Sequence, residues 1–307
     1  MISEFERAGL AVLERGWLSS NNILFPGDDR NESVLVDSGY WSHGAQTVAL
    51  VQRVLNGRRL QRIVNTHLHA DHCGGNHALQ QAFDCAIDVP AGEADKVDRW
   101  DEAALTFRAT GQHCPRFTRS GKIAAGDEVT LGAWPWQAIG SPGHDPESMV
   151  LYQPDLELLI SADALWENGF GIVFPEIEGE RAFDDVRATL DMLSALRVRW
   201  VIPGHGSPFA DPAAAVARAH RRLDGLIADP ARHARHAAKV LIKFHLMELQ
   251  AQPVAALATW LDKTDCVRMA HRRFGADRPF RDWWQALVEE LRASGALRVR
   301  DGVVENC

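Results

Sequence analysis

Residues 65–75 read NTHLHADHCGG and place four side chains that commonly bind metal ions on one short segment. A strand is predicted before this segment and a helix after it, so the segment is a strand-to-helix turn. His67 and His69 are two residues apart and point to the same side while the chain stays extended. Asp71 and His72 are adjacent and project differently where the chain bends. One turn can therefore supply ligands to two neighbouring metal ions.

Three later segments each add one more such side chain where a predicted strand gives way to a loop. They carry His144 after a strand at 136–139, Asp163 after the run 156–161, and His205 after the run 200–202. Because strand ends can converge on a single cleft, we expect all seven side chains to meet at one site. Five imidazoles and two carboxylates suit zinc, iron or manganese.

The composition is that of an ordinary globular protein, with 46% hydrophobic and 24% charged residues among 307. No apolar run approaches the roughly 20 residues of a membrane span, and the first residues lack the pattern of a signal peptide. Five cysteines are an odd and sparse set that favours a reducing compartment over a disulfide framework. We therefore expect a cytoplasmic protein with no membrane partner.

Charge divides the chain near residue 210. Residues 1–210 contain 29 acidic and 17 basic residues, whereas residues 211–307 contain 12 acidic and 16 basic ones. The overall charge of −8 argues against a dedicated nucleic-acid binder, although the basic tail favours weak contact with an anionic substrate. We expect a catalytic domain at 1–210 and a second domain at 211–307.

Hydrophobic patterning supports the same division. In the first part, apolar runs alternate with helical periodicity, which predicts two sheets with helices outside them. The predicted strands lie at 22–25, 33–36, 62–65, 136–139, 149–152, 156–161 and 200–202, and the helices at about 45–57, 76–83 and 181–197. The second part predicts helix over 212–248, three shorter helices at about 253–262, 265–273 and 281–294, and a hairpin at Asp301-Gly302. Three helices followed by a small hairpin are typical of a winged helix.

Taken together, these motifs resemble the metallo-β-lactamase superfamily, whose His-x-His-x-Asp-His signature is matched in full at 67–72. The resemblance covers roughly residues 20–210, and the later ligands follow in the family's order and spacing. It implies an α+β protein: an αββα sandwich of two facing sheets flanked by helices, with the site along one edge. The tail resembles the small helical, winged-helix-like C-terminal domain of the lactamase-β-like-2 group.

The resemblance also implies a role for each ligand. One metal ion would be held by His67, His69 and His144, and a second by Asp71, His72 and His205, with Asp163 bridging the two. The cofactors would be two divalent ions, zinc first, with iron and manganese as alternatives. A hydroxide shared between the ions and oriented by Asp71 would be the nucleophile, because bound metal lowers the pKa of water from 15.7 to about 7.

The expected activity is hydrolysis of a small ester, a thioester or a lactone. Zinc lactamases that destroy antibiotics generally lack the full ligand set seen here, which disfavours that role. Glyoxalase II enzymes share all seven ligands, but this chain has only two tyrosines and no recognisable glutathione clamp. An RNA-cleaving phosphodiesterase, a regulatory protein that binds through its winged helix, a one-iron persulfide dioxygenase and a homodimeric assembly stay open as alternatives.

Several other residues carry expectations. Aromatic side chains after Asp163 are predicted to form a wall of the substrate pocket: Trp166, Phe170 and Phe174. Residues 90–120 predict either a lid or a surface helix that packs its aromatic residues. Cys73 is expected to be a small buried residue beneath the ligand turn. A stretch of helical histidines is interpreted as a helix surface, since no acidic partner accompanies it: His233, His236 and His245.

Overall fold

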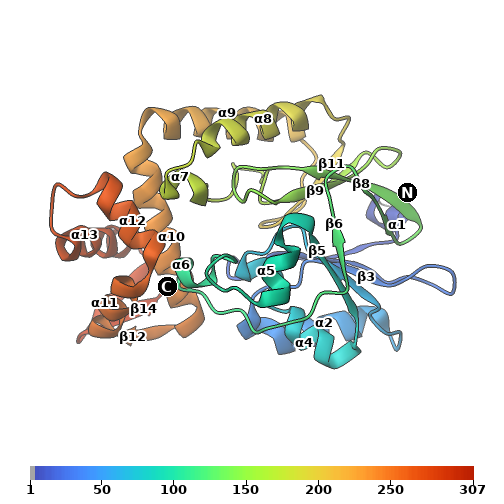
Figure 1. Ribbon diagram of the computed structural model, residues 1–307, viewed down its shortest axis with the longest axis horizontal. Coiled ribbons are helices and arrows are strands. Elements are labelled where there is room, and N and C mark those ends of the chain that lie inside the picture. Colours follow the sequence, from blue (N-terminus) through green and yellow to red (C-terminus); the bar gives the residue numbers. More distant parts are fainter. Residues whose placement is uncertain (1–3) are drawn as a thin grey trace.

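The computed structural model describes residues 4–307, and within them two large sheets face each other (Figure 1). The first sheet has the strand order β1-β2-β3-β4-β5-β6: β1 (Ala11–Leu13), β2 (Asn22–Phe25), β3 (Val34–Val36), β4 (Arg62–Val64), β5 (Ala86–Pro90) and β6 (Gly121–Ile123). The second has the order β11-β10-β9-β8-β7: β7 (Glu128–Leu131), β8 (Trp134–Gly140), β9 (Met149–Gln153), β10 (Leu158–Ala162) and β11 (Trp200–Pro203).

Alternation along the strands explains why the sheets stack. In β2 and β3, Leu24 and Leu35 belong to one buried cluster, whereas Ile23 and Val36, which are paired across the strands, belong to another. The first cluster includes side chains of the flanking helices, and the second includes Trp136 and other residues of the opposite sheet. Because side chains of a strand point alternately to its two faces, each sheet is apolar on both sides. The predicted αββα sandwich is confirmed.

Helices cover the outer face of each sheet (Figure 1). The first sheet carries α2 (Gly44–Leu55) and α4 (Asn76–Phe83), and the second carries α8 (Ala182–Ala195) and α9 (Pro212–Ala228). Shorter helices lie in the connections: α1 (Glu4–Ala8), η1 (Trp41–His43), α3 (Ala70–Cys73), η2 (Ala91–Glu93), α5 (Ala94–Arg99), α6 (Phe107–Thr110) and α7 (Phe174–Glu178).

The C-terminal part is helical and packs beside one end of the sandwich (Figure 1). Its elements are α10 (Pro230–Leu249), β12 (Ala251–Pro253), α11 (Val254–Lys263), α12 (Asp265–Phe274), α13 (Phe280–Ala293), β13 (Leu297–Arg300) and β14 (Val303–Asn306). The hairpin at Asp301-Gly302 forms as predicted, and β12 adds a third strand to it. The helical stretch 212–248 is two helices rather than one, because Asp229 caps α10 and Pro230 begins it.

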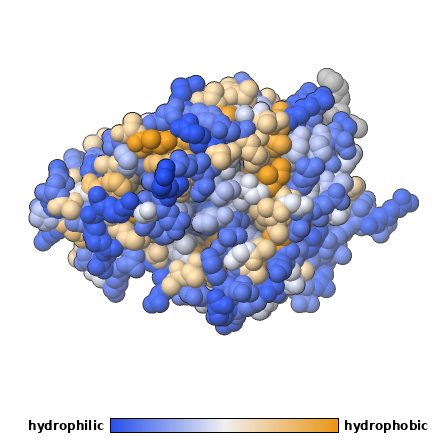
Figure 2. All heavy atoms as spheres, turned by 45° about the horizontal axis from the view of Figure 1, so that its top comes forward, coloured by the Kyte–Doolittle hydropathy of each residue, from blue (hydrophilic) through white to orange (hydrophobic). Residues whose placement is uncertain are grey.

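The segment 90–120 uses its aromatic residues for packing. Trp100 contacts both Phe107 and Phe117, and the latter two are buried in the core. Across the described part of the chain, no helix is long and apolar enough to cross a membrane. The face seen in Figure 2 is mostly hydrophilic, with apolar side chains gathered in separate patches.

Candidate active site

The seven predicted side chains come together at one edge of the sandwich, and all are buried. The loop between β4 and α3 supplies His67 and His69, α3 supplies Asp71 and His72, and the loops after β8, β10 and β11 supply His144, Asp163 and His205. Their possible ligand atoms form three groups, each within 4.8 Å: His67, His69 and His144; His67, His72 and Asp163; Asp71, His72 and His205. The expectation that the strand ends converge on one site is met by these positions.

Asp163 lies between the two halves of the cluster. Its Oδ1 is 3.3 Å from Nε2 of His72 and 3.8 Å from Nε2 of His205, while its Oδ2 is 3.4 Å from Nε2 of His144. Ala162, just before it, adopts a φ of 45°, and the pairing of β10 with β11 shifts register there. This irregular strand end turns the carboxylate of Asp163 toward the histidines.

Direct contacts also join the members of each half. Nδ1 of His69 is 2.7 Å from Nε2 of His144, and Nε2 of His205 is 3.1 Å from Oδ2 of Asp71. Space for these contacts depends on Gly204, because a Cβ atom there would lie 2.3 Å from Oδ1 of Asp163. A larger residue at position 204 would therefore displace the carboxylate.

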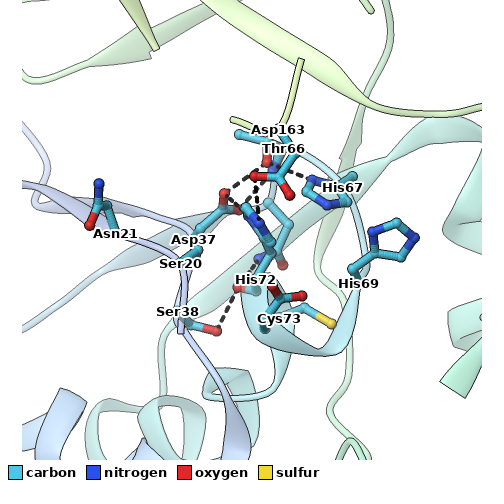
Figure 3. A network of polar contacts seen from close by, with 12 residues as sticks. Ser20, Asn21, Asp37, Ser38, Thr66, His67, His69, His72, Cys73 and Asp163 are labelled. Carbon is cyan, nitrogen blue, oxygen red and sulfur yellow. Dashed lines mark hydrogen bonds and ion pairs between the residues drawn. The ribbon is translucent and has the colours of Figure 1, made fainter. Parts of the chain in front are cut away.

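Neighbouring groups fix how the imidazoles face. Asp37 accepts a hydrogen bond from Nδ1 of His72 at 2.8 Å and two more from Thr66, at 2.9 Å from its N–H and 2.7 Å from its hydroxyl (Figure 3). Nδ1 of His144 donates to the backbone oxygen of Ile172, and Nδ1 of His67 is 3.1 Å from the Thr66 hydroxyl. Contacts of this kind orient histidines that bind metals through the other ring nitrogen.

The ring nitrogens of the cluster and the charges of its carboxylates indicate whether it suits metal ions. Nε2 of His67 is buried and has no hydrogen-bond partner among the described residues, and the buried Nε2 of His72 has the Asp163 carboxylate beside it as an ion-pair contact at 3.3 Å. Burial alone lowers a histidine pKa, yet Asp163 and Asp37 raise that of His72 well above its ordinary value. Burial alone would raise the pKa of Asp163, but His72 and His205 hold it well below its ordinary value. The carboxylates thus favour a cation here, and the donor set fits divalent ions.

Other histidines of the cluster favour the neutral form that binds metals. Burial lowers the pKa of His69 to about 4, although the charges of Asp71 and Asp163 oppose the shift. Burial, with the charge of His69 adding to it, lowers the pKa of His144 to about 4 as well. Burial and the neighbouring histidines lower the pKa of His67 well below its ordinary value. A neutral imidazole keeps a lone pair available for coordination.

A cavity of about 490 Å³ opens beside the cluster, which is within the range of small-molecule sites. Five of the seven side chains line it: His69, Asp71, His144, Asp163 and His205. Trp166 and Phe174 also line it, as predicted for a pocket wall. Trp166 donates from Nε1 to Oδ1 of Asp163 at 3.1 Å. On the opposite side the wall comes from α10.

Phe170 differs from the expectation. It is 2% exposed, belongs to the core beneath α8 and α9, and is not among the residues that line the cavity. The helical histidines differ too: His233 is buried and accepts a hydrogen bond from the Val173 N–H, and the other two are half-buried. This part of α10 packs against the sandwich, so its histidines lie in an apolar environment. Cys73 is fully buried, as predicted.

Sequence reasoning missed several residues around the cavity. Trp17 is 54% exposed and stacks on His205 with ring centroids 5.5 Å apart. Two carboxylates were also missed: Asp37, which accepts from Nδ1 of His72, and Asp145, whose Oδ2 is 3.7 Å from Nε2 of His69. Arg222 lines the cavity from α9. Asp145 directly follows His144, so its position was a usable signal, whereas the others are brought in only by tertiary packing.

The part of the chain that carries this site resembles known proteins. The sequence matches the metallo-beta-lactamase superfamily over residues 15–205. A hydroxyacylglutathione hydrolase from Hyphomonas neptunium is 34% identical over 115 residues, and one from Brucella ovis is 29% identical over 118 residues. Each match covers 38% of this chain and 38% of the relative, so the similarity spans little more than a third of these curated proteins.

Solved structures share the fold. A beta-lactamase domain protein from Burkholderia ambifaria has a TM-score of 0.60 at 20% identity, covering 97% of this chain and 92% of that one. A metallo-beta-lactamase family protein from Thermus thermophilus has a TM-score of 0.55 at 20% identity, covering 98% and 99%. The FEZ-1 metallo-beta-lactamase from Legionella gormanii has a TM-score of 0.57 at 14% identity, covering 73% and 94%. The chain belongs to the metallo-β-lactamase superfamily.

Proposed function

We propose that this chain is a metal-dependent hydrolase of small esters, with a thioester as the preferred substrate and a lactone as the alternative. The observation that carries the proposal is the continuity between the histidine and aspartate cluster and a cavity with mainly apolar walls. Two further points support it: the superfamily, and the relatives named hydroxyacylglutathione hydrolase, whose named substrate is a thioester.

We assign two divalent ions to the cluster, zinc first. The first would be held by His67, His69 and His144, the second by Asp71, His72 and His205, and Asp163 would serve both. Bound ions of this kind polarise a carbonyl group and lower the pKa of water from 15.7 to about 7. Trp166 keeps the Asp163 carboxylate in one orientation through its hydrogen bond to Oδ1.

Asp71 is the residue that we assign to the attacking water. Its carboxylate lines the cavity and is held by Nε2 of His205 at 3.1 Å, so it is fixed in direction and open to a ligand. A carboxylate in that position can accept a hydrogen bond from water and orient it toward a carbonyl carbon. Phe174 and Trp17 would limit where that carbonyl lies, because both line the same cavity.

Glutathione itself is a poor match for this cavity. Neither tyrosine lines it: the Tyr40 hydroxyl donates to Glu248 at 2.8 Å, and the Tyr152 hydroxyl donates to the Arg197 backbone oxygen at 2.9 Å. The wall from α10 is instead largely apolar. A small thioester with an apolar body fits better than a peptide-like thiol.

RNA is also a poor match. The apolar cavity wall offers little to a phosphate backbone, which is bound mainly through basic side chains. Many basic residues of the C-terminal part already pair with acids, such as Arg235 and Lys239 with Glu290, and Arg298 with Glu305. The weak positive charge of this region is therefore partly neutralised.

The experiment is a substrate panel on the zinc-loaded chain: butanoyl and hexanoyl thioesters of a small thiol, matching lactones, and a single-stranded RNA. We expect thioester hydrolysis that a chelator abolishes and zinc restores, with the RNA left intact. Cleavage of RNA without thioester turnover, or thioester turnover that is indifferent to chelation, would contradict the proposal.

A further inference from the structure

Helices α9 and α10 form a part of the cavity wall that contains none of the seven side chains of the cluster. Residues of α10 at helical spacing line the cavity with apolar side chains: Val240, Leu241, Phe244 and Met247. Ile172 and Phe174, which contact His144 and His69, add to this apolar lining. Outside the cluster, a ligand in the cavity therefore meets mainly apolar side chains.

Arg222 of α9 also lines the cavity. Its guanidinium lies 5.1 Å from the centroid of the Phe170 ring, and its Nη2 is 3.3 Å from Nε2 of His236. Within residues 4–307 it has no carboxylate at ion-pair distance. Asp224, two residues further along α9, is held by Arg187 at 2.7 Å. A sheltered guanidinium without an anion is costly, so its place on a cavity wall points to a ligand.

The groups beside Arg222 do not supply that anion. Burial, with the charge of Arg222 adding to it, lowers the pKa of His236 to about 4, so its imidazole is neutral near pH 7. Lys243 also lines the cavity, but its three N–H groups have three acceptors: the backbone oxygens of Ala296 and Cys307 and the Asn306 side chain. The guanidinium of Arg222 has five N–H groups and hydrogen-bonds to His236, so among the described cations that line the cavity it is the one with N–H groups left for a ligand.

We propose that Arg222, with His236 beside it, binds a carboxylate of the substrate that is separate from the reacting carbonyl. This inference rests on the proposed thioesterase function and narrows its substrate class. One guanidinium presents two N–H groups to the two oxygens of a carboxylate and matches its single charge. The carboxylate belongs either to the acyl group or to the thiol, and the two cases are separated by experiment.

The first experiment measures binding, so it does not depend on turnover. Non-hydrolysable thioethers are titrated into the zinc-loaded full chain by calorimetry: a neutral one, one with a carboxylate ending the acyl-side chain, and one with it ending the thiol-side chain. We expect one carboxylated thioether to bind at least about tenfold more tightly than the neutral one, or about 1.4 kcal/mol. Equal affinities of all three would overturn the inference.

Substitutions at position 222 test whether the preference for a carboxylated thioether depends on Arg222. Arg222→Met removes the charge and should reduce the preference to about onefold, whereas Arg222→Lys should keep part of it, because the charge remains without the planar fork. Arg221→Met is the matched control, since Arg221 is the exposed neighbour on the same helix and does not line the cavity. It should retain the full preference, and thermal melting of each variant checks that it is folded.

The outcomes also separate this inference from the proposed function. Carboxylate binding that depends on Arg222, without hydrolysis of any thioester, would leave the anion site standing and remove the thioesterase function. Hydrolysis of thioesters with no carboxylate preference in the unaltered chain, or a preference that survives Arg222→Met, would leave the function standing and overturn the role of Arg222.

Discussion

Buried or half-buried histidines gather in two regions of this molecule, and the two groups are built differently. The histidines at the strand ends share their space with Asp71 and Asp163, and their ring nitrogens face one another and these carboxylates. The histidines of α10 have other neighbours: His233 accepts from the Val173 N–H, and the His245 ring, whose Nε2 is buried without a hydrogen-bond partner, stacks on Trp260 with centroids 4.1 Å apart. Within the described ranges, no carboxylate approaches the α10 histidines at ion-pair distance.

The two groups of histidines differ in the features that suit metal binding. Number and burial do not distinguish the two regions, since His233 is as sheltered as His144. The distinguishing features are a carboxylate at contact distance and a ring nitrogen that faces other ligand atoms. Acid neighbours compensate the charge of a divalent ion, and the helical group has none within residues 4–307.

The largest change in zinc content and turnover should follow the removal of the Asp163 carboxylate. Asp163→Ala deletes the carboxylate that touches both halves of the cluster, so zinc content should fall below two ions per chain and turnover by about 10³-fold or more. His245→Gln in the helical group is the matched control and should keep both ions. Metal analysis after dialysis, with thioester turnover, provides the readout; an Asp163→Ala protein with full zinc and activity would show that the cluster is not the metal site.

A smaller effect on zinc binding is expected from Asp37, which contacts His72 and is not itself one of the seven candidate ligands. Asp37→Asn keeps the size of the side chain but removes the charge that orients His72 and favours a cation beside it. Zinc affinity should fall about 10–100-fold, as is typical for such supporting residues. Competition with a chromogenic chelator measures it. Asp88→Asn, whose parent carboxylate pairs with Arg62 elsewhere in the first sheet, is the control, and an equal loss in both variants would contradict the argument.

For the α10 histidines we predict that pH changes the free energy of unfolding, and we predict no role in metal binding. Burial lowers the pKa of His233 to about 4 from an ordinary value of 6.5, with His236 and Arg222 adding to the shift. The folded state therefore binds fewer protons than the unfolded state between those pH values. The stability that this group contributes is present in full above about pH 6.5 and declines as the pH falls toward 4.

His233→Gln should remove that titration. In metal-free protein, its free energy of unfolding should fall less steeply over this range than that of the unaltered chain, by up to about 1.4 kcal/mol per pH unit. Urea unfolding at several pH values measures the two slopes. The strand-end histidines titrate in both proteins and cancel in the comparison, so identical slopes would refute the burial argument.

The sequence was sufficient for the sandwich and for the expectation that the seven candidate side chains meet in one place. Short apolar runs and the 67–72 motif are local patterns, and His144, Asp163 and His205 each follow a recognisable strand. The interpretation of Phe170 and of the α10 histidines was wrong because both depend on which face α9 and α10 turn toward the sandwich. The helical periodicity of a segment indicates that one of its faces is buried. It does not indicate which element that face packs against when a long connection separates the two in the sequence. Arg222 reaches the cavity through the same packing, whereas Trp17 reaches it from the connection between β1 and β2.

We propose that two metal ions occupy the strand-end cluster and that none occupies the α10 histidines. A crystal structure of the zinc-loaded protein, with anomalous data collected at the zinc edge, tests both statements at once. We predict two peaks about 3.5–4 Å apart, within bonding distance of His67, His69, Asp71, His72, His144, Asp163 and His205. A single peak, no peak at these residues, or a peak at His233 and His236 would contradict the account.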